Sequence, residues 1–512
     1  MSGERLFRGQ DWDFTVLQRV YDACDEIARS DLGLSIYPNQ IEVITAEQML
    51  DAYSSVGMPL FYKHWSFGKH FVHHETLYRK GIEGLAYEIV INSSPCISYL
   101  TEENTATMQT LVIAHAAFGH NHFFKNNYLF KQWTDADGIL NYLEFAKGYV
   151  GQCEQRYGRV AVEQTLDAAH ALMSHGVDRY PGKRKTDLRA EERRANERRA
   201  HQESAFNDLW RTIPTGPLKT VAELTAERRR ALLGLPQENL LYFLEKSAPR
   251  LHPWQRELLR IVRHIAQYFY PQGQTKVMNE GAATYVHYRV MTKLHELGRL
   301  SDGDFIEFLH SHTNVVFQPD FDDKRFSGFN PYALGFAMMQ DIERIVIQPE
   351  AEDWEWFPKI AGTNDVMAVL RDIWTNYRDD SFISQFLSPS LMRRMRMFHL
   401  HDDPDNRNGV KVEAIHNERG YRRVRRELAR QYDVSFIDPN IEIVDVDLAG
   451  DRRLVLRHAA VNGALLHETE TNLVLQHLAD LWSYDVLLTE VDAADSVLKR
   501  HTASPRTIAA AA

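Results

Sequence analysis

The spacing of apolar side chains predicts helices along most of the chain. Apolar positions recur at helical intervals among charged neighbours, which is typical of amphipathic helices with one buried face. Helices are expected over residues 10–30, 40–60, 105–124, 138–157, 160–174 and, with breaks, 239–396. Gly158 separates two of them and indicates a helix stop.

The pattern changes after a segment rich in turn-forming residues, HDDPDNRNG at 401–409. Short alternating runs there predict strands, and two stretches predict helices. The strands are expected over 441–446, 454–457 and 486–491, and the helices over 419–431 and 471–482. The predicted fold class is therefore a mainly α-helical N-terminal and central region with a small C-terminal α+β domain.

These patterns divide the chain into five parts. They are an N-terminal helical region (1–180), a charged linker or exposed helices (181–235), a central helical region (236–400), an α+β domain (405–495) and a disordered tail (496–512). Residues 181–204 of the charged part include almost no apolar residues and so have no face to bury. A basic interaction patch is the alternative reading of the same segment.

Composition and charge narrow the class of protein. The 512 residues are 44% hydrophobic and 25% charged, which is enough for several apolar cores. The 59 basic and 70 acidic side chains leave a net charge of −11, which does not favour a general nucleic-acid binder.

The location of the protein follows from what the sequence does not contain. No window reaches the roughly 20 apolar residues of a membrane helix, and the N-terminus has no apolar signal core. Cys24, Cys96 and Cys153 are sparse and form no CxxC pair, which is typical of a reducing compartment. We therefore expect a cytoplasmic protein without membrane insertion.

The segment VIAHAAFGHNHFF at 112–124 contains three histidines, and imidazole is the commonest metal ligand. His115 and His122 are seven residues apart and share a face of an α-helix. His115 and His120 meet only if the helix ends or widens at Gly119, since a five-residue spacing suits a π-type turn. The alternative is that these histidines are hydrogen-bonded core or surface residues.

The segment MNEGAATYVHY at 278–288 places Glu280 and His287 on one helix face. Its Asn-Glu-Gly-x-Ala start resembles the helix that supplies the glutamate ligand in gluzincin-type zinc aminopeptidases. The first helix departs from their HExxH pattern, because Ala116 stands where the catalytic base belongs. A divalent-metal site, with zinc as the first candidate, is predicted at His115, His120, Glu280 and His287.

Two further stretches concentrate polar side chains. In HSHTNVVFQP, His310 and His312 are two residues apart, so a strand or loop would direct them to one side. Together with Glu280 they are the candidate catalytic residues. KHFVHHETLYRKG holds His70, His73, His74 and Glu75. Either stretch is equally consistent with loop histidines that are already hydrogen-bonded.

Several familiar sites are missing. The sequence has no P-loop, no GxGxxG after a strand and no GxSxG elbow. These absences disfavour nucleotide hydrolysis, dinucleotide chemistry and α/β-hydrolase chemistry.

Long segments resemble the stage V sporulation protein R (SpoVR) family. They include FGKHFVHHETLYRKGIEGLAYEIVINSSPCISYL, MNEGAATYVHY, EFLHSHTNVVFQP, NPYALGFAMMQDIER and VDLAGDRRLVLRH, and the likeness extends from about residue 10 to residue 492. His122 occupies the variable place inside the family's GHNxFF motif. The family's signature positions fall on His115, His120, Asn121, Glu280, His287, His310 and His312.

The resemblance implies a role in spore cortex formation, or in stress response where the host does not sporulate. It also implies a PrkA-type serine kinase and a von Willebrand-type domain protein as partners, but no settled reaction. Two functions therefore remain open. One is a metal-dependent hydrolase in which Glu280 or a nearby carboxylate is ligand or base. The other is a non-catalytic adaptor for the kinase system, whose C-terminal module binds a partner.

Overall fold

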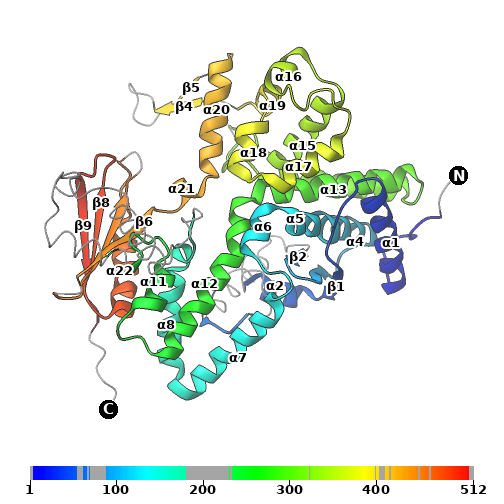
Figure 1. Ribbon diagram of the computed structural model, residues 1–512. Helices are drawn as coiled ribbons and strands as arrows, with labels where there is room; N and C mark the ends of the chain where they lie inside the picture. The colour runs from blue at the N-terminus through cyan, green and yellow to red at the C-terminus, as the bar shows by residue number, and fades with distance from the viewer. Residues whose placement is uncertain are drawn as a thin grey trace, which may run out of the picture. The chain divides into compact units, whose positions relative to one another are not determined.

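The chain divides into two units, each formed by two stretches that are distant in sequence. Unit 1 comprises Met1–Gln152 and Tyr268–Asp433, and unit 2 comprises Cys153–Gln267 and Val434–Ala512. The computed structural model in Figure 1 describes residues 4–54, 61–65, 69, 88–179, 230, 233–321, 323–397, 399–402, 410–413, 417–447, 450–460 and 463–506. Most of the predicted charged segment at 181–235 lies outside these ranges, as do His70, His73, His74 and Glu75.

Helices make up most of unit 1. Its first stretch contains α1 (Phe14–Ser30), α2 (Ala46–Ser54), α4 (Ala106–Ile113), the π-helix η1 (Ala114–His120), α5 (Asn121–Asn126), α6 (Tyr128–Trp133) and the start of α7 (Ile139–Tyr157). Its second stretch begins within α12 (Pro253–Gln274). It then contains α13 (Lys276–Glu296), α14 (Asp302–Val315), α15 (Pro331–Ile347), α16 (Ala351–Trp356), α17 (Val366–Asn376), α18 (Asp379–Phe386), α19 (Pro389–Arg394) and α20 (Glu418–Gln431). The helices predicted at 10–30, 105–124 and 138–157 are confirmed.

A small sheet covers part of this helical body. Its strands β1 (Asn39–Ile44), β2 (Glu88–Ile91) and β3 (Cys96–Thr101) lie in the order β1-β3-β2, with β1 parallel and β2 antiparallel to β3. The helix predicted over 40–60 is therefore wrong for its first residues, since β1 pairs with β3 and the helix α2 begins only at Ala46. A separate hairpin joins β4 (His399–Asp402) and β5 (Val410–Glu413).

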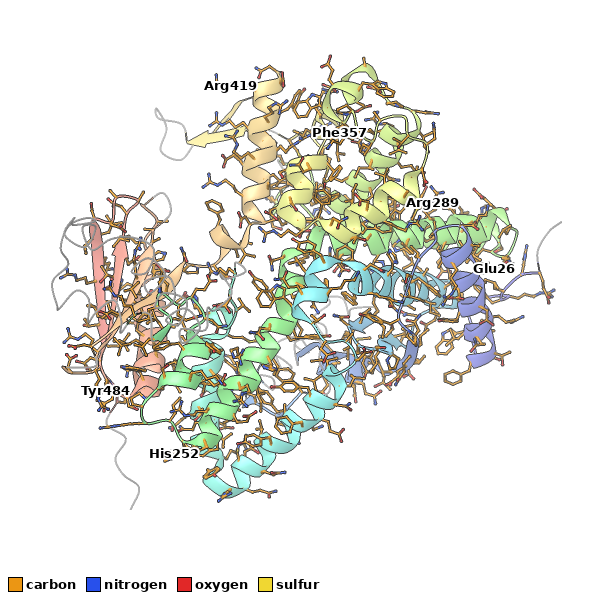
Figure 2. All side chains as sticks on the ribbon, in the orientation of Figure 1. Glu26, His252, Arg289, Phe357, Arg419 and Tyr484 are labelled. Carbon is orange, nitrogen blue, oxygen red and sulfur yellow. The ribbon has the colours of Figure 1, made fainter. Side chains whose placement is uncertain are left out.

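Helix α13 lies at the centre of unit 1, between η1 and α15 (Figure 1). Small residues allow the backbones to touch on both sides. A Cβ added to Gly281 would lie 2.6 Å from the Cα of Gly335, and one added to Gly119 would lie 2.5 Å from the Cα of Ala283. At the outer edge, Arg289 (Figure 2) forms an ion pair with Glu343 of α15. The positions of η1, α13 and α15 are thus closely coupled.

The N-terminus of α13 is held by a buried aspartate from α18. The two side-chain carboxyl oxygens of Asp379 accept hydrogen bonds from the backbone N–H groups of Val277, at 2.8 Å, and Met278, at 2.9 Å. These N–H groups have no partner within the helix, because the first turn of any helix leaves them unpaired. Asp379 is 0% exposed, so water does not replace it.

Substitution of Asp379 by alanine is expected to lower the free energy of unfolding by about 2 kcal/mol, since two buried donors lose their acceptor. Asp379→Asn retains one acceptor oxygen and is expected to lose about half as much. Urea unfolding followed by tryptophan fluorescence measures both changes. Equal stability of the alanine and asparagine variants would contradict this role for the carboxylate.

Unit 2 combines helices with a four-stranded sheet. It contains α8 (Arg159–Ala171), η2 (Met173–His175), α11 (Leu240–Ser247), α21 (Val434–Ile437), β6 (Ile441–Val446), β7 (Leu454–Ala459), α22 (Glu468–Trp482), β8 (Val486–Val491) and β9 (Val497–Ala503). The strand order is β6-β7-β8-β9. Strands β7 and β8 are parallel, with α22 as their crossover, and the outer strands pair antiparallel.

The predicted fold class is confirmed, because the chain is mainly helical to about residue 431 and then forms this sheet. The helix at 160–174 and the strands at 441–446, 454–457 and 486–491 are present. Two boundaries differ from the sequence prediction. Residues 497–503 form β9 and so do not belong to a disordered tail, and the basic helix α20 belongs to unit 1, where it packs on α18.

The membrane prediction and the state of the cysteines can be compared with the described part of the chain. Within these ranges, no helix combines the length and the apolar character that crossing a bilayer requires. Cys24, Cys96 and Cys153 are all free and buried.

Candidate metal centre

The π-helix η1 brings His115 and His120 together. In a π-helix, each backbone hydrogen bond spans five residues rather than four, so residues five apart lie near the same face. The backbone N–H of Asn121 accordingly reaches the carbonyl of Ala116, five residues earlier. The two imidazole rings lie 4.6 Å apart, centroid to centroid, at 88°. The widened turn that this histidine spacing required is present.

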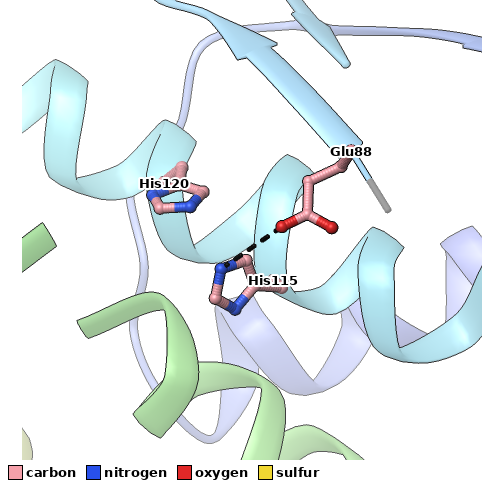
Figure 3. Close-up of side chains that lie close together, drawn as sticks. All are labelled: Glu88, His115 and His120. Atoms are coloured by element: carbon pink, nitrogen blue, oxygen red, sulfur yellow. Dashed lines mark ion pairs between the residues drawn. The ribbon is translucent and has the colours of Figure 1, made fainter. Parts of the chain in front are cut away.

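Two carboxylates approach these histidines from other elements. Oε1 of Glu88, at the start of β2, lies 3.6 Å from Nε2 of His115, and a dashed line marks this ion pair in Figure 3. Oε2 of Glu280, on α13, lies 3.9 Å from the same nitrogen and 3.5 Å from Nε2 of His120. Ligand atoms of Glu88, His115 and His120 all lie within 4.8 Å of one another.

These separations suit a metal ion. Ligand bonds of 2.0–2.2 Å in a tetrahedron place neighbouring ligand atoms about 3.3–3.6 Å apart. The nitrogen–oxygen distances of 3.5–3.9 Å are therefore close to the value expected around one shared centre. Only small side-chain movements are needed to complete the geometry.

Unpaired polar atoms at this centre test the fit directly. Nε2 of His115 and Oε2 of Glu280 are buried, and neither has a hydrogen-bond partner among the described residues. Buried polar atoms without a partner are unfavourable by about 1–3 kcal/mol each. A cation between them would bind both atoms, so the residues present fit a metal.

Contacts on the side away from Glu280 fix the orientation of the His120 ring. Its Nδ1 lies 3.0 Å from Oδ1 of Asn279, an oxygen that only accepts. The ring therefore donates from Nδ1 and directs an unprotonated Nε2 towards Glu280. The ring of Phe124 stacks on it at 5.8 Å between centroids. Such outer contacts commonly fix the tautomer of a metal-binding histidine.

The pKa values of the two carboxyl groups are shifted in opposite directions. Burial raises the pKa of Glu88. Burial acts in the same direction on Glu280, but His120, His115 and the Tyr332 hydroxyl outweigh it and lower the pKa of that carboxyl. Burial lowers the pKa of His120 to about 4, whereas for His115 the two carboxylates outweigh burial and raise the pKa. The centre thus combines an ionised Glu280 with a neutral His120.

Comparison with known proteins identifies the family. A family model described as SpoVR like protein matches residues 11–437, and one described as SpoVR-like C-terminal domain matches residues 439–493. The chain belongs to the SpoVR family. It is 52% identical over 502 residues to the "Uncharacterized protein YcgB" of Escherichia coli (strain K12), covering 98% of this chain and 97% of that relative. No solved structure matches it.

In this SpoVR chain, His287 lies behind His115 and does not face the carboxylates. Its Nδ1 is 2.9 Å from Nδ1 of His115, and its Nε2 is 2.9 Å from Nδ1 of His312. His312 is buried on α14, whereas His310 is exposed and contacts Asn314 at 3.5 Å. The segment is a helix rather than the expected strand or loop, so residues two apart point in different directions.

The signature residue Asn121 and its neighbour His122 have structural contacts. Nδ1 of His122 lies 3.0 Å from both the backbone N and the carbonyl O of Ser35, and Asn121 binds the backbone of Tyr37. Sequence reasoning missed Glu88 and Asn279. The only local signal for Glu88 is an acidic residue beside the apolar run Ile89–Ile91, which does not reveal its neighbours in space.

Proposed function

We propose that this SpoVR-family protein binds a divalent metal ion, zinc as the first candidate, and acts as a metal-dependent hydrolase. The proposed ligands are His115, His120 and Glu280. The observation that supports this most strongly is that Nε2 of His115 and Oε2 of Glu280 are buried 3.9 Å apart, and neither has a hydrogen-bond partner among the described residues. Family membership by itself supplies no reaction.

The differing pKa directions assign separate roles to the two carboxylates. A divalent ion at this position supplies Lewis acidity and an activated water. Glu280, with its lowered pKa, stays ionised as a ligand. Glu88, with its raised pKa, holds or releases a proton at Oε1 beside His115, as a general base or acid does.

Substrate access is possible from the carboxylate side. The side chains of Glu88 and Glu280 retain 19% and 17% of their surface, whereas those of His115 and His120 retain only 4% and 8%. The histidines thus form the closed floor of the centre, and a substrate would approach past the carboxylates.

The proposed setting is a cytoplasmic sporulation or stress pathway, in which a PrkA-type serine kinase and a von Willebrand-type domain protein are the expected partners. The resemblance to the SpoVR family is the basis of this proposed setting. The SpoVR resemblance is also the basis of the alternative function, a non-catalytic adaptor of the kinase system.

Metal content measured by mass spectrometry on untagged protein tests the proposal. We expect close to one metal ion per chain in the native protein and less than about a tenth of that in His115→Ala and Glu280→Ala, since each loses a direct ligand. His310→Ala, which removes an exposed histidine, is the matched control and should keep its metal. A native protein without metal, even after incubation with zinc, manganese or ferrous iron, would favour the adaptor.

Catalysis is tested separately from binding. Glu88→Gln should retain the metal but lose at least about a hundredfold of the turnover of a chromogenic ester, peptide or phosphoester, because it removes the proton acceptor. Full activity of this variant would exclude Glu88 as the base or acid.

A further inference from the structure

Three histidines from three elements form a continuous hydrogen-bonded chain behind the metal centre. Nδ1 of His115 on η1 lies 2.9 Å from Nδ1 of His287 on α13, and Nε2 of His287 lies 2.9 Å from Nδ1 of His312 on α14. Their exposed fractions are 3%, 1% and 5%. Water therefore does not substitute for these contacts, and the three rings act on one another directly.

We propose that His287 and His312 are positioning residues, which hold His115 in the tautomer whose unprotonated Nε2 faces the metal. This inference rests on the proposed metal site. It assigns a role to two signature histidines that do not reach the carboxylates. It also explains why the centre is backed by imidazoles rather than by apolar side chains.

Hydrogen-bond chemistry determines which ring nitrogen donates at each step along the three histidines. A hydrogen bond between two ring nitrogens needs one N–H and one lone pair, and a neutral imidazole has one of each. If His115 donates from Nδ1, then Nδ1 of His287 accepts and its proton sits on Nε2. His287 then donates to Nδ1 of His312, so one choice fixes all three tautomers.

The opposite direction is incompatible with ligation. It would place the proton of His115 on Nε2, the atom nearest Glu88 and Glu280, and a protonated nitrogen cannot bind a metal. Metal binding therefore selects one direction of hydrogen-bond donation along the three histidines. A chain already held in that direction needs no reorganisation when the metal enters.

Aromatic side chains enclose the far end of this hydrogen-bonded chain of histidines. The rings of Tyr288, Phe308 and Phe336 lie 4.8–5.6 Å from that of His312, centroid to centroid. These aromatic contacts hold the His312 ring in place.

Zinc affinity, measured by competition with a chromophoric chelator, provides the first test. His287→Phe keeps a planar ring but removes both hydrogen bonds, and we expect affinity to fall about 10- to 100-fold, as for other outer-shell changes. His287→Gln keeps an acceptor oxygen and a donor amide and should retain most of the affinity. His312→Phe should weaken binding less than His287→Phe, and His310→Phe, two residues away and exposed, should leave it unchanged. Equal affinities for the Phe and Gln variants of His287 would overturn the proposal.

Nitrogen-15 NMR of the imidazole groups in metal-free protein provides a second test that does not depend on the metal. We expect one tautomer each for His115, His287 and His312, and a mixed population at His115 in His287→Phe. Mixed tautomers in the wild-type protein, or no change at His115 in the variant, would refute the positioning role of His287 and His312. Fixed tautomers in a protein that binds no zinc would instead refute the metal site alone.

Discussion

Replacement of Gly281 by alanine is expected to lower the free energy of unfolding of unit 1 by about 3 kcal/mol, at the upper end of the range for overpacking. The added Cβ would lie 2.6 Å from both Cα and C of Gly335 and 3.0 Å from its carbonyl oxygen. These are backbone atoms of α15, so no side-chain rotation relieves the clash. The higher helix propensity of alanine offsets only about 1 kcal/mol.

The same substitution should also weaken metal binding, because Glu280 precedes Gly281 on α13 and moves with it. Urea unfolding and metal content measure the two effects. Gly148→Ala is the matched control, since Gly148 is exposed on α7 and a Cβ there meets nothing within 4 Å. That variant should gain about 0.5–1 kcal/mol. If both variants were stabilised, the close approach of α13 and α15 would be wrong.

Replacement of Glu490 by alanine is expected to destabilise unit 2 by about 3 kcal/mol, because it removes the common acceptor of a buried network. Oε2 of Glu490 accepts from Nδ1 of His458, at 3.0 Å, and from the backbone N–H of Leu466, at 2.9 Å. Oε1 accepts from Nε2 of His501 at 2.8 Å. The side chains of His458, Glu490 and His501 lie on the adjacent strands β7, β8 and β9. Loss of the Glu490 carboxylate therefore disturbs the centre of the sheet.

Thermal unfolding monitored by circular dichroism measures this change. Glu442→Ala is the control, because Glu442 lies on the same sheet but is partly exposed, and its carboxylate is 3.6 Å from Arg457. It should lose less than about 1 kcal/mol, as exposed ion pairs do. Similar losses of stability in both variants would mean that the burial of Glu490 adds nothing to the stability of unit 2.

Glu490 also gives unit 2 a predicted acid sensitivity. Burial alone would raise the pKa of Glu490, but the donors Leu466, His501 and His458 outweigh it and lower the pKa below its ordinary value of 4.5. The carboxylate therefore stabilises the fold fully above about pH 4.5, and this contribution disappears as pH falls through the lower folded pKa. In Glu490→Gln, the stability of unit 2 should depend less steeply on pH in this acid range.

The candidate site was only partly predictable from the sequence. The spacing of His115 and His120 predicted that they would meet only if the helix ended or widened at Gly119, because a five-residue spacing suits a π-type turn. The pairing of that turn with Glu280 followed from motif likeness. The position of His287 behind His115 was not predictable, because a helical face shows which residues point together but not which neighbour each one meets.

The sequence by itself determined the helical pattern of unit 1, the strands β6, β7 and β8, and the histidine pair of η1. Local periodicity and helix geometry are sufficient for these features. Only the tertiary structure decided that Glu88 joins the centre, that His310 and His312 separate, and that β9 completes the sheet. Each of these depends on contacts between residues distant in the chain, and such contacts leave no periodic trace in the sequence.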